Sequence, residues 1–112
     1  MVKSDAVLRF LGLAMRAGKV VSGFDMVSAS IRKGEAEMII IAEDISKNTL
    51  SKILDVVSES KNESVDAYRF ESSFNLGNAI GKPSRALIAV TDKGFATKLS
   101  SMLSELDITE DK

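Results

Sequence analysis

The sequence predicts an α/β domain in which a sheet is layered between helices. Short, continuous apolar runs, typical of strands covered on both faces, alternate along the chain with segments whose apolar residues recur at helical spacing. The composition agrees with this prediction. The chain has 112 residues, of which 45% are hydrophobic and 28% charged, so its apolar content suffices for a core and is too high for a disordered protein. One domain is expected, without internal repeats or linkers.

Two helices are predicted at the start of the chain. Apolar residues repeat at helical spacing over residues 4–15, with Ser4 or Asp5 as the expected N-cap. A second helix is predicted to begin at Ser22, because Ser22 and Asp25 have the spacing of a capping box. The first part of the chain is therefore expected to be mainly helical.

Three strands are predicted after these helices. Residues 38–42 and 85–90 contain continuous apolar runs rich in branched side chains, the pattern of central strands. Residues 65–70 alternate apolar and polar side chains, which predicts a strand that is half exposed or near an edge. A short extra strand at residues 20–21 is also compatible with the sequence.

Three further helices complete the predicted order. They are expected at residues 48–60, at residues 74–80 and after Asp92, which is the predicted N-cap of the last one. A single domain is expected over residues 1–105. Residues 106–112 are acidic and poor in apolar side chains, which predicts a flexible, solvated tail.

The composition excludes most familiar catalytic and metal chemistry. The sequence has no cysteine and no histidine, which removes disulfides, thiolate zinc sites, cysteine nucleophiles and histidine bases. No apolar run approaches the roughly 20 residues of a membrane span, and the N-terminus lacks the apolar stretch of a signal peptide. We therefore expect a cytoplasmic protein with no metal, no cofactor and no catalytic residues.

Neither the glycine-rich loops nor the acidic pair indicates a catalytic site. The loops at residues 18–23 and 77–81 lack the ending of a P-loop and the three-glycine dinucleotide pattern. Glu43 and Asp44 follow an apolar strand, where functional groups often gather. With no other convergent acid or imidazole, we interpret these carboxylates as complementing the dipole of the following helix.

The charged residues give a mixed indication. A balance of 15 basic and 16 acidic residues, net −1, argues against a general polyanion binder. Arg16, Lys19, Lys82 and Arg85 nevertheless lie in glycine-punctuated loops, which present cations and backbone amides together to phosphate oxygens. Lysine and arginine are also the default surface residues, so the loops alone indicate no more than a soluble α/β domain.

Two separated motifs, in matching order, resemble a known family. The first comprises residues 17–23 (AGKVVSG), residues 31–36 (IRKGEA) and the strand end at residues 41–44 (IAED). The second is a leucine-glycine and glycine-lysine signature at residues 76–82 (LGNAIGK), before the last strand. Over nearly its whole length, the chain resembles the kink-turn-binding ribosomal protein family known as L seven-Ae and L thirty-e. The closing residues 90–95 (VTDKGF) are most similar to its small bacterial members.

This resemblance implies a three-layer α-β-α sandwich with a mixed, mainly four-stranded sheet, and no enzyme activity. It also implies binding of sharply bent RNA elements built on sheared G·A pairs, that is, a kink-turn-like element in ribosomal or other noncoding RNA. A helix N-terminus and neighbouring loops would read such RNA by its shape. The expected partner is structured RNA such as ribosomal RNA, with no DNA and no membrane, and the protein is expected to be a monomer.

The resemblance and the loop cations together predict one RNA-binding set. Its members are Arg16, Gly18, Lys19, Ser22, Gly23, Phe24, Asp25, Ser28, Asp44, Lys47, Lys82, Ser84 and Arg85, with Glu43 beside them. Two of them have a structural alternative. Phe24 is compatible with a hydrophobic anchor for its helix as well as a base-stacking platform, and Asp25 with a capping partner as well as a base contact.

The chain departs from the family pattern at several of these positions. Asp25 and Met26 stand where members commonly have asparagine or lysine and then glutamate. Ala29 replaces a lysine, Asp44 an asparagine of some relatives, and Ser84 an aromatic residue. A carboxylate repels phosphate and cannot donate to a base acceptor. The alternative function is therefore a protein interaction module on the same fold, with a degenerate RNA site and a protein partner.

Overall fold

The computed structural model describes the backbone of residues 3–60 and 65–110, and side chains up to residue 106. Helices and strands alternate along these residues. In chain order the elements are α1 (Ser4–Arg16), β1 (Val20–Ser22), α2 (Phe24–Arg32), β2 (Met38–Ile41), α3 (Lys47–Glu59), β3 (Asp66–Arg69), α4 (Ser73–Ala79), β4 (Leu87–Val90) and α5 (Lys93–Glu110).

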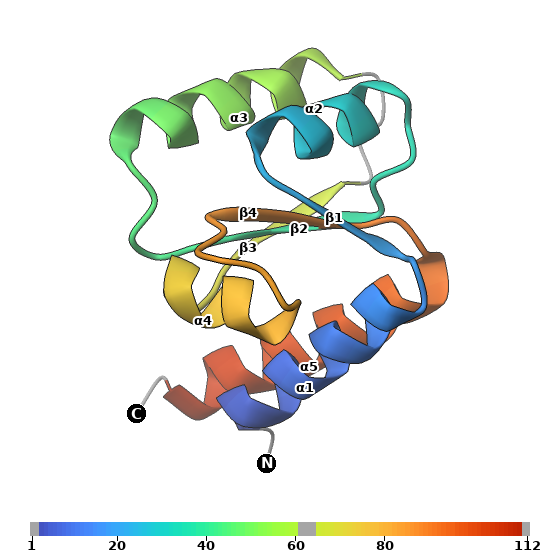
Figure 1. The fold of residues 1–112 in the computed structure, drawn as a ribbon, viewed down its shortest axis with the longest axis vertical. Coiled ribbons are helices and arrows are strands. Elements are labelled where there is room, and N and C mark those ends of the chain that lie inside the picture. Colours follow the sequence, from blue (N-terminus) through green and yellow to red (C-terminus); the bar gives the residue numbers. More distant parts are fainter. Residues whose placement is uncertain (1–2, 61–64, 111–112) are drawn as a thin grey trace.

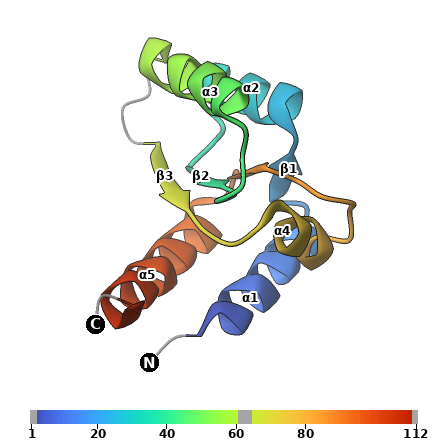
Figure 2. The ribbon, with the colours of Figure 1, turned by 90° about the vertical axis from the view of Figure 1, so that its left-hand side faces the viewer.

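The strands form one mixed sheet between two layers of helices (Figure 1). The strand order is β1-β4-β2-β3, with β4 antiparallel to both of its neighbours and β2 parallel to β3. Helices α2 and α3 cover one face, and α1, α4 and α5 cover the other, as Figure 2 also shows. The expected three-layer α-β-α sandwich with a mixed four-stranded sheet is confirmed.

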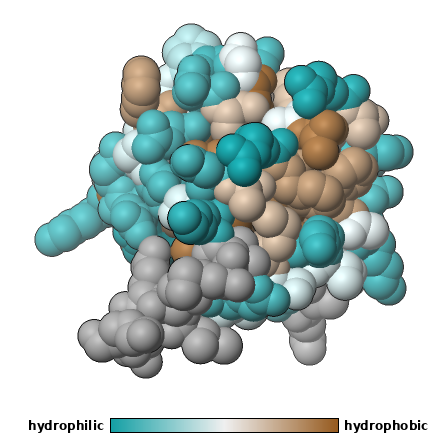
Figure 3. Space-filling view, turned by 90° about the horizontal axis from the view of Figure 1, so that it is seen from below, coloured by the Kyte–Doolittle hydropathy of each residue, from teal (hydrophilic) through white to brown (hydrophobic). Residues whose placement is uncertain are grey.

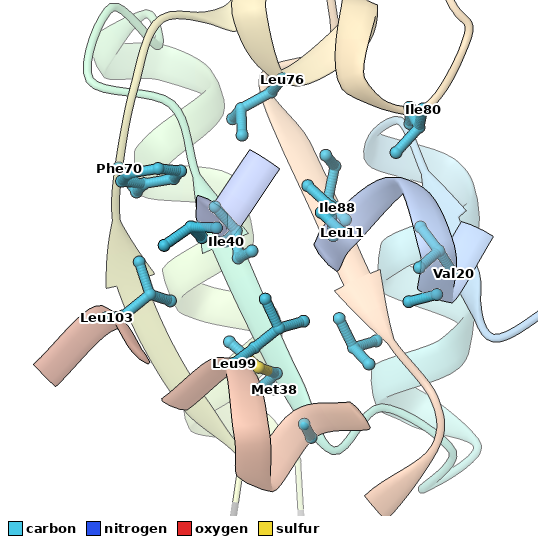
Figure 4. Packing of buried hydrophobic residues seen from close by; sticks show 14 of the residues in the cluster. Leu11, Val20, Met38, Ile40, Phe70, Leu76, Ile80, Ile88, Leu99 and Leu103 are labelled. Atoms are coloured by element: carbon cyan, nitrogen blue, oxygen red, sulfur yellow. The ribbon is translucent and has the colours of Figure 1, made fainter. Parts of the chain in front are cut away.

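Each face of the sheet has its own apolar core, because successive strand residues point to opposite faces. Every residue of β2 and β4 is buried, which confirms that these apolar runs are central strands. Figure 4 shows the core under α1, α4 and α5, where Leu11, Ile40 and Leu99 meet. The core on the other face is formed by Val27, Ile31, Ala36, Ile39, Ile41, Ile53, Val56, Leu87 and Ala89.

The edge strand and the last helix cap agree with the prediction, whereas the first cap does not. β3 lies at one edge of the sheet and most of its residues are exposed. At the start of α5, the backbone N–H of Phe95 donates to Asp92 Oδ2 at 2.9 Å. The N-cap position of α1 is occupied by Lys3, without a side-chain hydrogen bond, so neither Ser4 nor Asp5 caps that helix.

The start of α2 also differs from the prediction. Ser22 belongs to β1, where it pairs with Ile88, and the helix begins at Phe24 after Gly23. The predicted Ser22–Asp25 capping box does not form. The Ser22 hydroxyl instead accepts a hydrogen bond from Arg85, with 3.2 Å between Nε and Oγ. Strand pairing and a partner distant in sequence therefore override the local capping pattern.

α5 continues into the predicted tail. Its backbone is helical to Glu110, and Leu106 is 7% exposed within the core beneath α1. The predicted boundary after residue 105 is therefore wrong for Leu106, because this residue continues the helical stripe of Leu99 and Leu103. Residues 111–112 lie outside the described part of the chain.

The surface seen from below combines hydrophilic and apolar areas (Figure 3). On the side formed by α1 and α5, Figure 3 shows a patch of apolar side chains bordered by hydrophilic ones. Large hydrophobic side chains are also exposed singly, among them Met26 on α2 and Phe74 on α4. None of the helices in the described residues is long and apolar enough to cross a membrane.

Candidate RNA interface

Most predicted site residues gather at one end of the sheet. β1, β2 and β3 run in one direction and β4 in the other, so the ends of the first three lie beside the start of β4. The segments that meet there are residues 22–26, 43–45, 72–75 and 81–86, which we name the strand-end surface. Its backbone hydrogen bonds join Gly23 N–H to Leu87 O (3.0 Å), Ala42 N–H to Ala86 O (2.9 Å) and Arg85 N–H to Ser73 O (2.9 Å).

The N-terminus of α2 opens onto this surface without a side-chain cap. Its N-cap residue is Gly23, whose φ of 89° lies in the left-handed region that glycine adopts without strain. Within residues 3–60 and 65–106, no side chain accepts a hydrogen bond from the backbone N–H groups of this first turn. Asp25 is exposed, while Phe24 is partly buried against the core beneath α2. This packing supports the anchoring interpretation of Phe24.

Arg85 is fixed opposite the start of α2. Its Nε donates to Ser22 Oγ at 3.2 Å, and its Nη1 donates to the carbonyl of Ser84 at 3.0 Å. Its Nη2 has no partner among the described residues, so one face of the guanidinium is available to a ligand. A shallow hollow between the two segments is lined by Ser22, Gly23, Phe24, Asp25, Met26, Ser84, Arg85 and Ala86.

Asp44 has a structural role that differs from the predicted one. Its Oδ1 accepts from the backbone N–H of Ser73 at 2.8 Å, and its Oδ2 accepts from the Ser73 hydroxyl at 3.0 Å. The backbone hydrogen bond from Ser73, followed by the hydroxyl, lowers the pKa of the Asp44 carboxyl. The carboxylate therefore joins the loop after β2 to the start of α4, and not to α3, whose N-cap is Ser46.

Close packing at Gly77 positions the loop that carries Lys82, Ser84 and Arg85. A Cβ atom built on Gly77 would lie 1.8 Å from the carbonyl oxygen of Pro83. The carbonyl of Gly77 also accepts the backbone N–H of Lys82 at 2.8 Å. The leucine-glycine signature thus has a physical reason, since only a residue without a side chain allows this loop to lie against α4.

Three predicted residues lie away from the strand-end surface. Gly18 and Lys19 precede β1, and the carbonyl of Lys19 accepts from Thr91 N–H at 2.9 Å. They therefore lie at the other end of β1 from Ser22, the residue that holds Arg85, about 10 Å away along a three-residue strand. Arg16 lines a groove between α1 and α4. The structure does not bring these residues together with Arg85.

Ser28 does not reach the surface. It is 2% exposed, and its hydroxyl has no hydrogen-bond partner within the described residues. A buried side chain in this position makes no contact with a ligand that approaches from solvent, so the structure removes Ser28 from the candidate contacts. Ser28 was predicted from the family resemblance, which places it on the second helix but does not tell the inward from the outward face of that helix.

The structure also reveals candidate contact residues that the sequence prediction missed. Arg69 ends β3, and its Nη2 donates to the carbonyl of Glu43 at 3.1 Å. Phe74 follows Ser73 and is 68% exposed, the most exposed of the large hydrophobic side chains described. The sequence predicted only a short helix starting at Phe74, and the docking of α4 on the sheet shows that Leu76 and Gly77 take its inner face.

Charges at this end of the sheet nearly cancel. The cations Lys47, Arg69, Lys82 and Arg85 are matched by the acids Asp25, Glu43, Asp44 and Glu71. Any RNA bound here must therefore be held by directed hydrogen bonds and shape more than by net charge. Among the residues that the structure describes, no group of three or more acidic side chains is placed to hold a metal ion.

Comparisons with known proteins agree with this fold. The model of the ribosomal protein L7Ae/L30e/S12e/Gadd45 family matches residues 5–100. The chain is 47% identical over 93 residues to RNA-binding protein YlxQ of Bacillus subtilis (strain 168), covering 83% of this chain and 90% of that protein. It is 30% identical over 91 residues to large ribosomal subunit protein eL8 of Thermoplasma volcanium, covering 81% of this chain and 74% of that protein.

A solved structure gives the same result. The structure of a protein with unknown function from Bacillus halodurans C matches with a TM-score of 0.79 and 31% sequence identity, covering 88% of this chain and 96% of that chain. The two relatives named above are described as RNA-binding and ribosomal proteins and not as enzymes, which agrees with the predicted non-catalytic role. Motifs, topology and these matches coincide, and the chain belongs to the ribosomal protein L7Ae/L30e/S12e/Gadd45 family.

Proposed function

We propose that this protein binds structured RNA without catalysis, and that its ligand is a kink-turn-like element of ribosomal or other noncoding RNA. The observation that carries the proposal is the uncapped N-terminus of α2, which faces the fixed guanidinium of Arg85 across a shared hollow. The names of the relatives, RNA-binding protein YlxQ and large ribosomal subunit protein eL8, support an RNA partner. In this role the protein acts in the cytoplasm as part of a ribonucleoprotein.

The two sides of the hollow have complementary tasks. The first-turn N–H groups of α2 belong to residues that line the hollow, and they favour phosphate or base acceptor groups, helped by the positive end of the helix dipole. Arg85 offers its free Nη2 from the other side. Because Ser22 and Ser84 already hold this side chain, little side-chain entropy is lost when RNA binds.

Asp25 adds selectivity to this site. It is an exposed carboxylate at the rim of the hollow, so it repels phosphate and accepts hydrogen bonds only from donors such as the amino group of guanine. Sheared G·A pairs place a guanine amino group at the edge of a bent helix. We therefore expect a preference for RNA that presents such a donor, with modest affinity because so few cations lie at the site.

A binding titration tests the proposal. The protein is titrated with a standard kink-turn RNA and with the same RNA whose G·A pairs are changed to Watson–Crick pairs, at near-physiological salt. Preference for the intact kink-turn supports shape-specific recognition. Equal weak binding, or no binding, contradicts it.

Charge reversals locate the interface. Arg85→Glu is expected to lower kink-turn affinity by at least about tenfold, because it removes a held phosphate or base contact. Lys52→Glu is the matched control, because Lys52 is exposed on α3, away from the hollow. Lys19→Glu distinguishes diffuse electrostatic attraction from a local site, since Lys19 lies at the other end of β1. A loss equal to that of Arg85→Glu indicates diffuse electrostatics, and a small loss indicates a local site.

The protein interaction module stays as the second candidate. The balanced charge at this end of the sheet and the exposed Met26, 57% accessible beside Asp25, favour it. An absence of RNA binding in the titration, with a folded protein, turns the assignment toward this function. The same hollow is then the first place to seek a protein partner.

A further inference from the structure

A groove between α1 and α4 is not used by the proposed kink-turn contact. Helices α1 and α4 lie side by side below the sheet (Figure 1, Figure 2), and the groove between them includes Arg9 and Arg16 on one wall and Asn75 and Asn78 on the other. Its floor is Gly12, where an added Cβ would lie 2.9 Å from the carbonyl oxygen of Ala79. The missing side chain at this position lets α4 pack closely against α1 at the bottom of the groove.

The two arginines form one line along α1. They are seven residues apart, which is nearly two helical turns, so they lie on the same face about 10 Å apart along the axis. Both are exposed, and neither makes a hydrogen bond or ion pair with any residue that the structure describes. Two exposed guanidinium groups spaced along one helix face suit successive phosphates of an extended polyanionic chain.

The opposite wall offers polar groups that suit the same ligand. Asn75 and Asn78 are both exposed on α4. Asn75 gives one N–H to Glu71 Oε1 at 2.8 Å and keeps its other amide groups available, and the Asn78 side chain has no partner among the described residues. Carboxamides both donate and accept, so they match phosphate oxygens as well as ribose hydroxyls.

The groove adjoins the strand-end surface. Asn78 accepts through its carbonyl the backbone N–H of Gly81 at 3.2 Å, and Lys82 follows directly in the loop that leads to Arg85. RNA bound between α2 and Arg85 therefore has a polar route past Lys82 into the groove. Asp5, the acidic residue lining the groove, lies one turn before Arg9 and limits the phosphate-binding stretch to the part between the two arginines.

We propose that this α1–α4 groove is a second contact surface for RNA, in which Arg9 and Arg16 bind phosphates of a stem that continues beyond the bent element while Asn75 and Asn78 contact its sugar–phosphate backbone. The inference rests on the proposed RNA-binding function. It adds the path that the stem flanking the bent element takes along the protein. Sequence is not read in this groove, because phosphate and ribose contacts position a duplex without specifying its bases.

The test compares two double variants on two RNAs. Arg9→Gln with Arg16→Gln removes two charges from the groove. Arg32→Gln with Lys33→Gln removes two charges from the exposed end of α2, on the other side of the sheet, and serves as the control. Each is titrated with a kink-turn RNA of minimal stems and with the same RNA whose stems are extended by one helical turn. Thermal unfolding verifies that both variants are folded.

The expected result is a selective loss for the groove variant on the extended RNA. Two lost phosphate contacts make the salt slope of log affinity shallower by about 1.4 to 1.8. The ratio of wild-type to groove-variant affinity for the extended RNA then falls about 7- to 12-fold between 50 and 200 mM salt. Asp5→Asn is expected to act in the opposite direction and to tighten binding of the extended RNA.

Other outcomes overturn the inference in distinguishable ways. Equal effects of the two double variants on RNA that wild type binds refute the groove and leave the proposed function intact. An equal loss on minimal and extended stems also refutes it, because no contact to the flanking stem is then involved. If wild type binds RNA without preferring the kink-turn, the two double variants are compared on an unkinked duplex. A selective loss for the groove variant then supports the groove contact, and equal losses refute it. If wild type binds no RNA, the proposed function and the groove both fail.

Discussion

Replacement of Gly77 by alanine is the sharpest test of how the fold positions the interface. The new Cβ would lie 1.8 Å from the carbonyl oxygen and 2.6 Å from the carbonyl carbon of Pro83. Both atoms belong to the backbone, so the clash is not relieved by a side-chain rotation, and the loop or α4 must move. Overpacking of this kind costs about 1–3 kcal/mol, even after the gain in helix propensity from glycine to alanine.

This cost converts into a measurable change in melting temperature. At about 2.1 cal/mol/K per residue, unfolding the 112-residue chain has an entropy near 0.24 kcal/mol/K, so each kcal/mol lowers the Tm by about 4 °C. We expect Gly77→Ala to lower the Tm by about 4–13 °C in thermal unfolding followed by circular dichroism. RNA affinity should fall as well, since the displaced loop carries Arg85.

Two other glycines provide a graded control. A Cβ on Gly12 would lie 2.9 Å from the carbonyl oxygen of Ala79, and one on Gly94 would lie 3.2 Å from the carboxylate of Asp92, which has to shift by only a few tenths of an ångström. The destabilisation should therefore decrease from Gly77→Ala to Gly12→Ala to Gly94→Ala, and the last should be close to neutral. Two results would refute the reasoning. One is a Gly77→Ala protein that melts within 2 °C of wild type, and the other is a Gly94→Ala protein whose Tm is lower than that of Gly77→Ala.

Three further predictions concern single side chains. Asp44→Asn should be less stable than wild type at neutral pH, and the difference should vanish in acid. Ser73 lowers the pKa of the Asp44 carboxyl, so the contribution of this carboxylate to folding stability is present above the ordinary carboxyl pKa and is lost as the pH falls through the lowered pKa. Parallel Tm–pH profiles for the two proteins contradict this. Leu106→Ala should cost about 2 kcal/mol, or about 8 °C in Tm, because the side chain is buried; an unchanged urea midpoint favours the tail prediction instead. Phe74→Ala should leave the Tm unchanged and lower RNA affinity about tenfold if an unstacked base rests on the exposed ring; Leu54→Ala, similarly exposed on α3, should do neither.

Much of the layered architecture was encoded locally. Continuous apolar runs at residues 38–41 and 87–90 require cover on both faces, and that requirement alone places helices on either side of the sheet. The polar alternation of β3 likewise predicted an edge. The motif around Gly77 also carried real structural information, although its reason, the contact with the Pro83 backbone, appears only when α4 and the loop are docked.

Local signals failed wherever a distant partner competed for the same group. Ser22 had the spacing of a cap, but its hydroxyl is taken by Arg85, 63 residues further on. Asp44 had the position of a helix-dipole partner for α3, but its oxygens are taken by Ser73. Composition suggested a tail from residue 106, but the position of Leu106 on a helix that packs against α1 makes it a core residue.

Residue types and periodicities within each segment were enough to predict the fold class, the order of elements and the absence of thiol and imidazole chemistry. The arrangement of the candidate interface depends instead on how the segments pack together. Strand direction brings Ser22, Ser73 and Arg85 to one end of the sheet and leaves Lys19 at the other, and helix docking separates buried Ser28 from exposed Phe74. Which side chains share a surface depends on contacts between segments far apart in the chain, and no local pattern contains them.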